Sequence, residues 1–434
     1  MHDLLDPKRP KKPASNWYSW FVLFLLVCVY TVNWIDRYVF VILMESIKQD
    51  LGLSDAVLGA LSGLAFAVIY SIAAIPIARW ADQYNRRSII AIGLGFWSLM
   101  TAACGLAANA VQLGMARLGV GLGEAACSPP AHSLISDYFP SRQRATAFAI
   151  YGLGVSFGIT LGLFLGGWIN EHYGWRIAFM AVGAPGILLA IVIRFAIREP
   201  KRGSADAGPV DSKDYSFLQV ARYLFSRPAF VSYGLGLGLF NLSAFAFDNW
   251  SPVFLIRLEN MDSAQVGAWT GFLGGPAGLL GTICVGIFAD FLSKRDLRWY
   301  LWITMVVIGL MIPAILLFLF VPGKIKMLFY FVSIFCIAGY LAPFIAITQR
   351  LVPLHMRAIS SAVLFVFLNI FGGIGPFIVG VLNDLFENTF GLEAIKYSIA
   401  IVQSAGLIGI ALIAYGAYRL PRDFKMQFSV NNSP

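Results

Sequence analysis

The chain of 434 residues is 58% hydrophobic and only 13% charged, whereas soluble proteins are about 45–50% apolar and about 25% charged. This composition leaves too little charge to coat a water-facing surface, and it excludes a disordered chain, a coiled coil, a disulfide scaffold and a nucleic-acid-binding protein. The net charge of +9 follows the loops, and the five cysteines lie in apolar segments. Most of the surface is therefore expected to face lipid.

Apolar segments of membrane-spanning length follow one another along the whole chain. A spanning helix needs about 20 mostly apolar residues, and backbone groups in hydrocarbon must be hydrogen-bonded within their own segment, so segments this long are helices. The sequence predicts an all-α membrane protein with twelve transmembrane helices, arranged as two six-helix bundles. The expected spans are 17–44, 56–80, 88–108, 111–136, 144–169, 176–197, 229–256, 265–291, 299–321, 326–349, 357–383 and 394–418.

Lysine and arginine are distributed unevenly between the two sets of loops. If the N-terminus is cytoplasmic, the loops and tails on that side carry 24 of the 32 cationic residues and the other side carries six. The remaining two, Arg37 and Arg117, lie within spans. Because cytoplasmic loops are enriched in these residues, both the N- and C-termini are expected in the cytoplasm.

A polar stretch separates the sixth span from the seventh and indicates a linker between the two bundles. The predicted organisation is a cytoplasmic tail (1–16), an N-terminal bundle (17–197), a cytoplasmic linker (198–228), a C-terminal bundle (229–418) and a second cytoplasmic tail (419–434).

The two halves also share a loop pattern, which indicates an internal repeat. After the second and eighth spans, an aspartate is followed four and five residues later by two cations. We expect these loops to form a cytoplasmic gate, in which each aspartate pairs with an arginine at a neighbouring helix end: Arg142 or Arg144 in the first half, Arg350 or Arg357 in the second. The predicted gate residues are Asp82, Arg86, Arg87, Arg142, Asp290, Lys294 and Arg295.

This architecture and the repeated loop together resemble the major facilitator superfamily, whose loop signature is approximately G-x-L-A-D-R-x-G-R-R. The first copy here reads ARWADQYNRR, with Ala78 and Asn85 in place of the two glycines, and the second reads GIFADFLSKR. Within the superfamily, the segments NWIDRYVF, RLGVGLGEAACSPPAHSLISDYFPSRQRA and GGPAGLLGTICVGIFAD resemble the spinster-type lipid transporters. The resemblance implies a proton-linked or facilitative carrier of lysophospholipids and sphingoid-base phosphates.

Ionisable residues inside spans cost about 2.5–3.5 kcal/mol each on insertion scales, so each is a candidate functional residue. The first half contains Asp36, Arg37, Arg117 and Glu124, and in the second half Asp248 is comparable. At 1.5 Å per residue, Asp36 and Arg117 lie at matching depths, roughly 12 and 9 Å below the outer ends of their helices. In the fold that the chain resembles, the first and fourth helices both line the central cavity, so we expect Asp36 to pair with Arg117 and Arg37 and Glu124 to complete the network.

These four residues are predicted to couple transport to protons. A carboxylate in a cavity changes its proton affinity as water and a nearby arginine move with conformation. Glu124 has no cation at neighbouring helical positions and is the expected main proton carrier, whereas Asp36 is expected to stay ionised until its pair opens. A static structural network is the alternative, and either arginine is also suited to hold an anionic headgroup.

The second half offers aromatic and amide side chains where the first offers charges, which suits an amphiphile with a headgroup and a tail. Aromatic residues at helical spacing are also common on lipid-facing and core surfaces. Multidrug efflux and uptake of a small organic anion remain alternative functions; cations in both halves of the cavity would favour the anion. The predicted cavity residues are Arg37, Tyr151, Asn241, Phe245, Asn249, Trp250, Phe365 and Asn369.

The remaining expectations concern chemistry and environment. Gly154 to Gly158 match a hydrolase pattern but lie in an apolar span, so an enzyme is not expected. The four histidines are scattered, and neither a metal nor a cofactor is expected. The expected partners are the lipid bilayer, an amphiphilic lipid substrate and protons, with no nucleic acid. We expect a monomer in a bacterial inner membrane.

Overall fold

A computed structural model describes residues 17–202, 217–352 and 356–431, and every regular element in these ranges is helical. The helices of the first half are α1 (Trp17–Leu51), α2 (Asp55–Gly59), the π-helical turn η1 (Ala60–Leu64), α3 (Ala65–Gln83), α4 (Arg86–Cys104), α5 (Ala110–Glu124), α6 (Ser128–Tyr138), α7 (Ser141–Tyr173) and α8 (Trp175–Ala196). Those of the second half are α9 (Phe217–Phe225), α10 (Pro228–Glu259), α11 (Ser263–Ser293), α12 (Trp299–Phe320), α13 (Lys326–Gly339), α14 (Leu341–Arg350), α15 (Arg357–Phe390), η3 (Gly391–Glu393), α16 (Ala394–Val402) and α17 (Ser404–Asn431).

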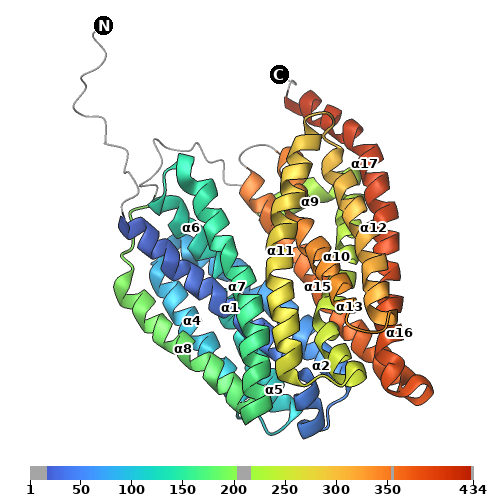
Figure 1. The fold of residues 1–434 in the computed structure, drawn as a ribbon. Coiled ribbons are helices and arrows are strands. Elements are labelled where there is room, and N and C mark those ends of the chain that lie inside the picture. Colours follow the sequence, from blue (N-terminus) through green and yellow to red (C-terminus); the bar gives the residue numbers. More distant parts are fainter. Residues whose placement is uncertain (1–16, 203–216, 353–355, 432–434) are drawn as a thin grey trace.

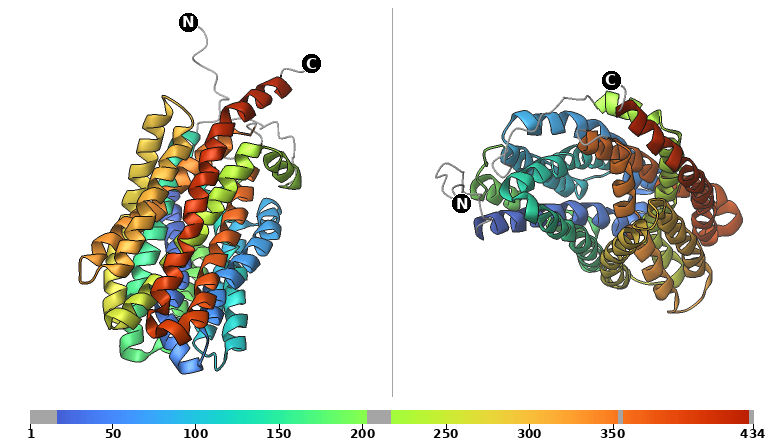
Figure 2. Two further views of the ribbon diagram at one scale, coloured as in Figure 1. Left: turned by 90° about the vertical axis from the view of Figure 1, so that its right-hand side faces the viewer. Right: turned by 90° about the horizontal axis from the view of Figure 1, so that it is seen from above.

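The two halves of the chain form two groups of helices that lie side by side. Figure 1 shows α1, α4, α6, α7 and α8 on the left and α10, α11, α12, α13, α15, α16 and α17 on the right, and the view from above in Figure 2 separates the same two groups by colour. The second expected span, formed by α2, η1 and α3, packs against α15 of the other half. The interface between the halves therefore includes this span.

Ten ranges of the described residues are long and apolar enough to cross a membrane. The last of them, Val363–Asp423, runs through both α15 and α17, whereas α5 and α6 are not among the ten. The all-helical membrane fold predicted from the sequence is thus confirmed. The count of twelve spans stays a prediction.

The fourth expected span is divided into α5 and α6, which the apolar run of the sequence does not reveal. Helix α5 ends at Glu124, and α6 begins at Ser128 with two prolines in its first turn. Proline has no backbone N–H group and is favoured at the start of a helix. The break therefore places Glu124 at a helix end in the middle of the molecule.

Glycines spaced by four along α7 bring α1 close to it, as small residues at this spacing allow. A Cβ atom added at Gly158 would lie 2.4 Å from Cβ of Trp34, and one at Gly162 would lie 3.0 Å from the Ile35 carbonyl oxygen. On another face of α7, a Cβ at Gly167 would lie 2.2 Å from the Ser263 carbonyl oxygen of α11. Helix α7 thus joins α1 to the second half.

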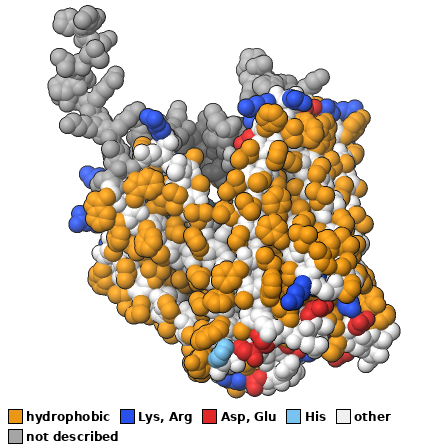
Figure 3. Space-filling view, viewed as in Figure 1, with side chains coloured by type: hydrophobic (Ala, Val, Ile, Leu, Met, Phe, Trp, Pro, Cys, Tyr) orange, Lys and Arg blue, Asp and Glu red, His pale blue; other side chains and the backbone are white. Residues whose placement is uncertain are grey.

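The surface separates apolar and charged side chains by height. Hydrophobic side chains cover the middle of the face in Figure 3, Lys and Arg gather towards its top, and Asp and Glu gather at its lower end. Helix α1 begins and α17 ends in the upper part of Figure 1. We name this the termini side, and the lower end the opposite side. An apolar belt between two charged ends is the surface expected of a membrane protein.

Candidate functional site: a cavity between the two halves

A cavity in the middle of the molecule is lined by side chains from both halves of the chain. Helices α1, α3 and α5 and the turn η1 contribute from the first half, and α10 and α15 contribute from the second. The lining residues are Trp34, Arg37, Tyr38, Val41, Ser62, Gly63, Phe66, Ala67, Arg117, Phe245, Asp248, Asn249, Asn369 and Gly373. A site shared by both halves lies where a movement of one half against the other would change its access.

Arg37 and Glu124 form an ion pair at the wall of this cavity. The Arg37 Nε atom donates to Oε2 of Glu124 over 2.8 Å. The Glu124 side chain has no exposed surface, whereas 20% of the Arg37 side chain is exposed. The pair joins α1 to the end of α5, and it leaves part of the guanidinium facing the cavity.

Aromatic rings hold both arginines of the site. The guanidinium carbon of Arg37 lies 4.5 Å from the ring centre of Phe66, and that of Arg117 lies 4.5 Å from Phe40 and 5.8 Å from Phe66. A cation over a ring face gains roughly 0.5–2 kcal/mol, more when it is removed from water. Phe66 of α3 therefore contacts both cations and keeps them apart.

The expected pairing of Asp36 with Arg117 is wrong. The Nη1 atom of Arg117 donates to the backbone oxygen of Asp36 at 3.5 Å, and neither carboxylate oxygen of Asp36 has a hydrogen-bond partner among the described residues. A match in depth does not fix the direction of a side chain around its helix. Successive residues point about 100° apart, so Arg37 faces the cavity and Glu124 while Asp36 faces the interior of the first half, with no exposed surface.

Tyr38 and Asp248 connect the two halves across the cavity. The Tyr38 hydroxyl donates to Oδ2 of Asp248, and both residues line the cavity wall. Asp248 lies well inside α10, which runs from Pro228 to Glu259. This aspartate, expected from the sequence only as an intramembrane ionisable residue, is thus a carboxylate that lines the cavity.

The predicted cavity residues are only partly brought together. Arg37, Phe245, Asn249 and Asn369 line the cavity, whereas the other four do not belong to its lining. Trp250 is buried and donates to the Pro376 carbonyl, Asn241 is buried and donates to the Leu368 carbonyl, and Tyr151 stacks on Tyr30 with 4.4 Å between ring centres. The sequence pattern placed these residues near the site but could not determine which face of each helix they occupy. Phe365, the fourth, is 39% exposed.

On the termini side, the first copy of the repeated loop forms an ion network with partners that were not predicted. Arg86 is almost fully buried and bonds to Asp137 and, over 2.7 Å, to Glu199. The backbone N–H of Arg87 also donates to Glu199.

The other residues expected to form this part of the gate are Arg142, Arg144 and Asp82. Arg142 is exposed, and Arg144 donates to the backbone oxygens of Ser136 and Phe139. The side chain of Asp82 lies outside the described residues. The gate pairing predicted for that aspartate stays a prediction.

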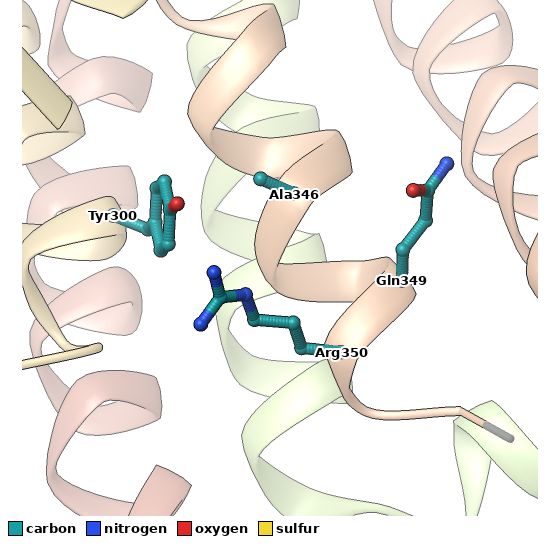
Figure 4. Close-up of a pocket in the computed structure, with 4 residues that line it drawn as sticks. All are labelled: Tyr300, Ala346, Gln349 and Arg350. Atoms are coloured by element: carbon teal, nitrogen blue, oxygen red, sulfur yellow. The ribbon is translucent and has the colours of Figure 1, made fainter. Parts of the chain in front are cut away.

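In the second copy of the repeated loop, Tyr300 contacts both Asp290 and Arg350. Asp290 accepts a hydrogen bond from the Tyr300 hydroxyl over 2.9 Å, and the guanidinium of Arg350 lies 5.4 Å from the centre of the Tyr300 ring. Tyr300 and Arg350 line a pocket between α12 and α14 (Figure 4). Of the two expected partners of Asp290, Arg350 does not pair with it directly, and the pairing with Arg357 stays a prediction because that side chain lies outside the described residues.

Other charged residues of the predicted gate lie near this loop. Lys294 and Arg295 are exposed, and the side chain of Arg357 lies outside the described residues. Arg298 bonds to Asp296 and lowers the pKa of that carboxyl. The negative charge of Asp296 is thus balanced by Arg298 next to it in the loop.

On the opposite side, a set of ion pairs that the sequence pattern does not predict joins the halves. Asp55 of α2 is buried and accepts hydrogen bonds from both terminal nitrogens of Arg257 at 2.6 and 2.8 Å. Arg257 also bonds to Glu45, and Asp55 to Lys48.

Helix α15 contributes to the same set. Asn383 donates to Asp55, and the backbone N–H groups of Asp55 and Ala56 donate to the Asp384 carboxylate. We name these six residues the interbundle clamp: Glu45, Lys48, Asp55, Arg257, Asn383 and Asp384. A Ser-Asp start of a helix is a capping signal, but the partners of Asp55 in the second half are 200 or more residues away in the chain.

Comparison with known proteins places the whole chain in one family. Residues 26–376 match the family described as the Major Facilitator Superfamily. A protein of Mycolicibacterium smegmatis named "MFS-type efflux pump" is 32% identical over 401 residues, which is 92% of each chain. A Bacillus subtilis protein named "Probable galactarate/D-glucarate transporter GudP" is 29% identical over 296 residues, or 62% of this chain and 64% of that one.

Among solved structures, a bacterial homologue of the human lysosomal transporter spinster, in an inward-facing and unoccupied conformation, superimposes with a TM-score of 0.86. It is 27% identical, and the match covers 94% of this chain and 99% of that chain. The protein is therefore a multi-pass membrane transporter with a resemblance to the spinster proteins, not an enzyme, and it belongs to the Major Facilitator Superfamily.

Proposed function

We propose that this protein transports amphiphilic lipids of the lysophospholipid or sphingoid-base phosphate type across the membrane, coupled to protons, by alternating access. The observation that carries the proposal is the cavity shared by both halves. One wall presents Arg37, which is paired with the buried Glu124 behind it, and the other presents Phe245, Asn249 and Asn369 beside Asp248. A polar wall facing an aromatic and amide wall suits a molecule with a charged head and an apolar tail.

Arg37 is the proposed headgroup ligand. One nitrogen of its guanidinium is bound to Glu124, and the side chain is partly exposed while it lines the cavity. A guanidinium offers five N–H donors and binds phosphate in a two-pronged geometry. Trp34, Phe66 and Phe245 supply the apolar surface for the tail.

Coupling follows from competition for Arg37. A phosphate that binds this arginine weakens its pair with Glu124, and a carboxylate that loses its cation in a buried site gains affinity for a proton. Protonation then removes the charge that ties α1 to the end of α5. Glu124 is thus the carboxylate whose partner the substrate displaces, and Asp36, which has no ion partner within the described residues, is a second proton site.

The conformation of the chain fits one stage of the transport cycle. The interbundle clamp closes the opposite side, and the related spinster structure is described as inward-facing. We infer that the termini side is cytoplasmic, that the clamp is the closed outer gate, and that the protein works as a monomer in a bacterial inner membrane.

Two other functions remain open to test. The relative named as an efflux pump makes drug export the second candidate, and the cavity carboxylate Asp248 would suit a cationic drug. A small dianion is less well matched, because both cations among the cavity lining residues, Arg37 and Arg117, belong to the first half. A dianionic sugar acid would contact cationic side chains on one wall of the cavity instead of on both.

The test is flux into liposomes that contain the purified protein under an imposed pH gradient, across a panel of lysophospholipids. Wild type is expected to show gradient-driven flux, and Glu124→Gln and Asp36→Asn are expected to reduce the gradient-dependent part at least about tenfold. Asp296→Asn, a change in a loop outside the cavity, is the matched control. Unchanged gradient-driven flux in both cavity variants would contradict the coupling role of these carboxylates.

The same vesicles separate lipid transport from drug export. A fluorescent cationic dye is added with and without unlabelled lysophospholipid. Lipid that moves in the absence of dye and blocks dye movement supports a lipid carrier. Dye movement that no lysophospholipid affects, together with no lipid flux, supports drug export instead.

A further inference from the structure

Asp36 faces a cluster of buried polar side chains inside the first half, here called the polar pocket, on the side of α1 that is turned away from the cavity. Its side chain has no exposed surface. Thr101 and Trp97 of α4 face its carboxylate, and Arg117 approaches its backbone oxygen from α5. Asp36 therefore lies among its own helix α1 and the neighbouring helices α4 and α5.

Small residues bring α4 close enough to form this pocket. A Cβ atom added at Gly123 of α5 would lie 2.7 Å from Cβ of Trp97, and one at Gly183 of α8 would lie 2.5 Å from the Ser98 carbonyl oxygen. Helix α4 is thus held between α5 and α8. Its Trp97 and Thr101 side chains have little freedom to turn away from Asp36.

The pocket contains hydrogen-bond donors and acceptors that are not paired with one another. Both carboxylate oxygens of Asp36 and Oε1 of Glu124 are buried acceptors with no hydrogen-bond partner among the described residues. The same holds for the donors Trp97 Nε1, Thr101 Oγ1, Arg117 Nε and Asn33 Nδ2. Buried polar groups normally bond to protein or to ordered water. Matching donors and acceptors that fail to meet directly suit bridging water, whereas the N–H donors and the nearby arginine disfavour a metal cation.

We propose that Trp97 and Thr101 are positioning residues that hold the Asp36 carboxylate as a proton store, with internal water linking it to Glu124. The inference rests on the proposed proton coupling. In the transfer, an O–H bond of a hydrated proton breaks and an O–H bond forms on the carboxylate, which becomes neutral. The charged and titratable groups around Asp36 are Arg37 on α1, Cys104 on α4, and Arg117 and Glu124 on α5.

Thr101→Val is the main test, because valine keeps the shape of threonine and removes its hydroxyl. The readout is the dependence of lysophospholipid flux on pH in proteoliposomes. A hydroxyl that faces a carboxylate and donates to it through bridging water favours the ionised form, so losing the hydroxyl is expected to move the midpoint of the profile up by about one pH unit. Thr101→Ser is expected to restore the wild-type midpoint. Trp97→Phe, which keeps an aromatic ring and loses the N–H group, is expected to shift it in the same direction.

Thr304→Val is the matched control. Thr304 is also fully buried in a helix, and its hydroxyl donates to the Tyr300 backbone oxygen instead of facing a carboxylate. The same substitution there is expected to leave the midpoint unchanged. Infrared difference spectra provide a second readout: a carboxylic acid C=O band that is absent in Asp36→Asn should change frequency in Thr101→Val.

The outcomes distinguish this inference from the proposed function. If Asp36→Asn removes the pH dependence while Thr101→Val and Trp97→Phe keep both the wild-type midpoint and the wild-type band, the positioning role is wrong and proton coupling stands. If Asp36→Asn and Glu124→Gln both keep the full pH dependence, the proposed coupling itself fails.

Discussion

At the scale of single residues, the Arg37–Glu124 pair is the contact on which the site depends, because Glu124 is wholly buried. Removing one member of a buried ion pair leaves an uncompensated charge and costs about 3–5 kcal/mol. We expect Arg37→Gln to lower the free energy of unfolding in detergent by about that amount. Adding Glu124→Gln should recover part of the loss. Purely additive effects in the double-mutant cycle would show that the two side chains do not interact.

The ionisable residues of the site could be identified from the sequence, but their pairing could not. Asp36, Arg37, Arg117 and Glu124 were identified because charges are costly within apolar spans. Which of two adjacent residues faces the cavity depends on the rotation of α1 against α4 and α5, and no helical pattern in α1 alone fixes that rotation. Glu124 also lies at a break between two helices, which the apolar run of the sequence does not reveal.

At the scale of the elements, the contact between α1 and α7 depends on glycine. A Cβ atom at Gly158 would lie 2.4 Å from Trp34 Cβ and 2.7 Å from the Thr31 carbonyl oxygen, whereas one at Gly152 meets nothing within 4 Å. We expect Gly158→Ala to force the helices apart and to destabilise the protein by about 1–3 kcal/mol, the usual cost of overpacking.

Gly152→Ala is the control in the same helix, and it is expected to be neutral or slightly stabilising, because alanine favours helix. Thermal unfolding of the two purified variants measures the difference. Equal melting temperatures would mean that α1 and α7 separate without cost.

The lengths and order of the elements were largely readable, and their interruptions were not. The apolar runs predict α7, α8, α10, α11 and α12 closely, since a spanning helix must satisfy its own backbone. Three interruptions do not change the hydrophobicity of the sequence: the division into α5 and α6, the π-turn η1, and the break between α13 and α14. These interruptions were therefore invisible to a pattern based on hydrophobic length.

At the scale of the whole molecule, the interbundle clamp is expected to set the balance between states. Arg257 is 8% exposed in its side chain and links α10 to both α1 and α2. Arg257→Gln should release the opposite side and favour its opening. A cysteine placed at Ser62, which lines the cavity, in an otherwise cysteine-free chain, should then react several-fold faster with a membrane-impermeant maleimide added on that side.

Arg176→Gln serves as the control for this prediction. Arg176 also forms an ion pair on the opposite side, with Asp50, but both residues belong to the first half and their side chains are about 40% exposed. Exposed pairs contribute about 0–1 kcal/mol, so labelling at position 62 should not change. An equal rise in both variants would indicate general loosening instead of release of the clamp.

The sequence by itself determined the environment, the helical class and the family resemblance, because long apolar runs and intramembrane charges are local properties that any fold of this chain must accommodate. Only the tertiary structure decided the pairing of Glu124 with Arg37, the isolation of Asp36 beside α4, and the clamp formed by Asp55 and Arg257. Each of these depends on how helices rotate and cross. The residue pattern along one helix does not show which of its faces will contact another helix.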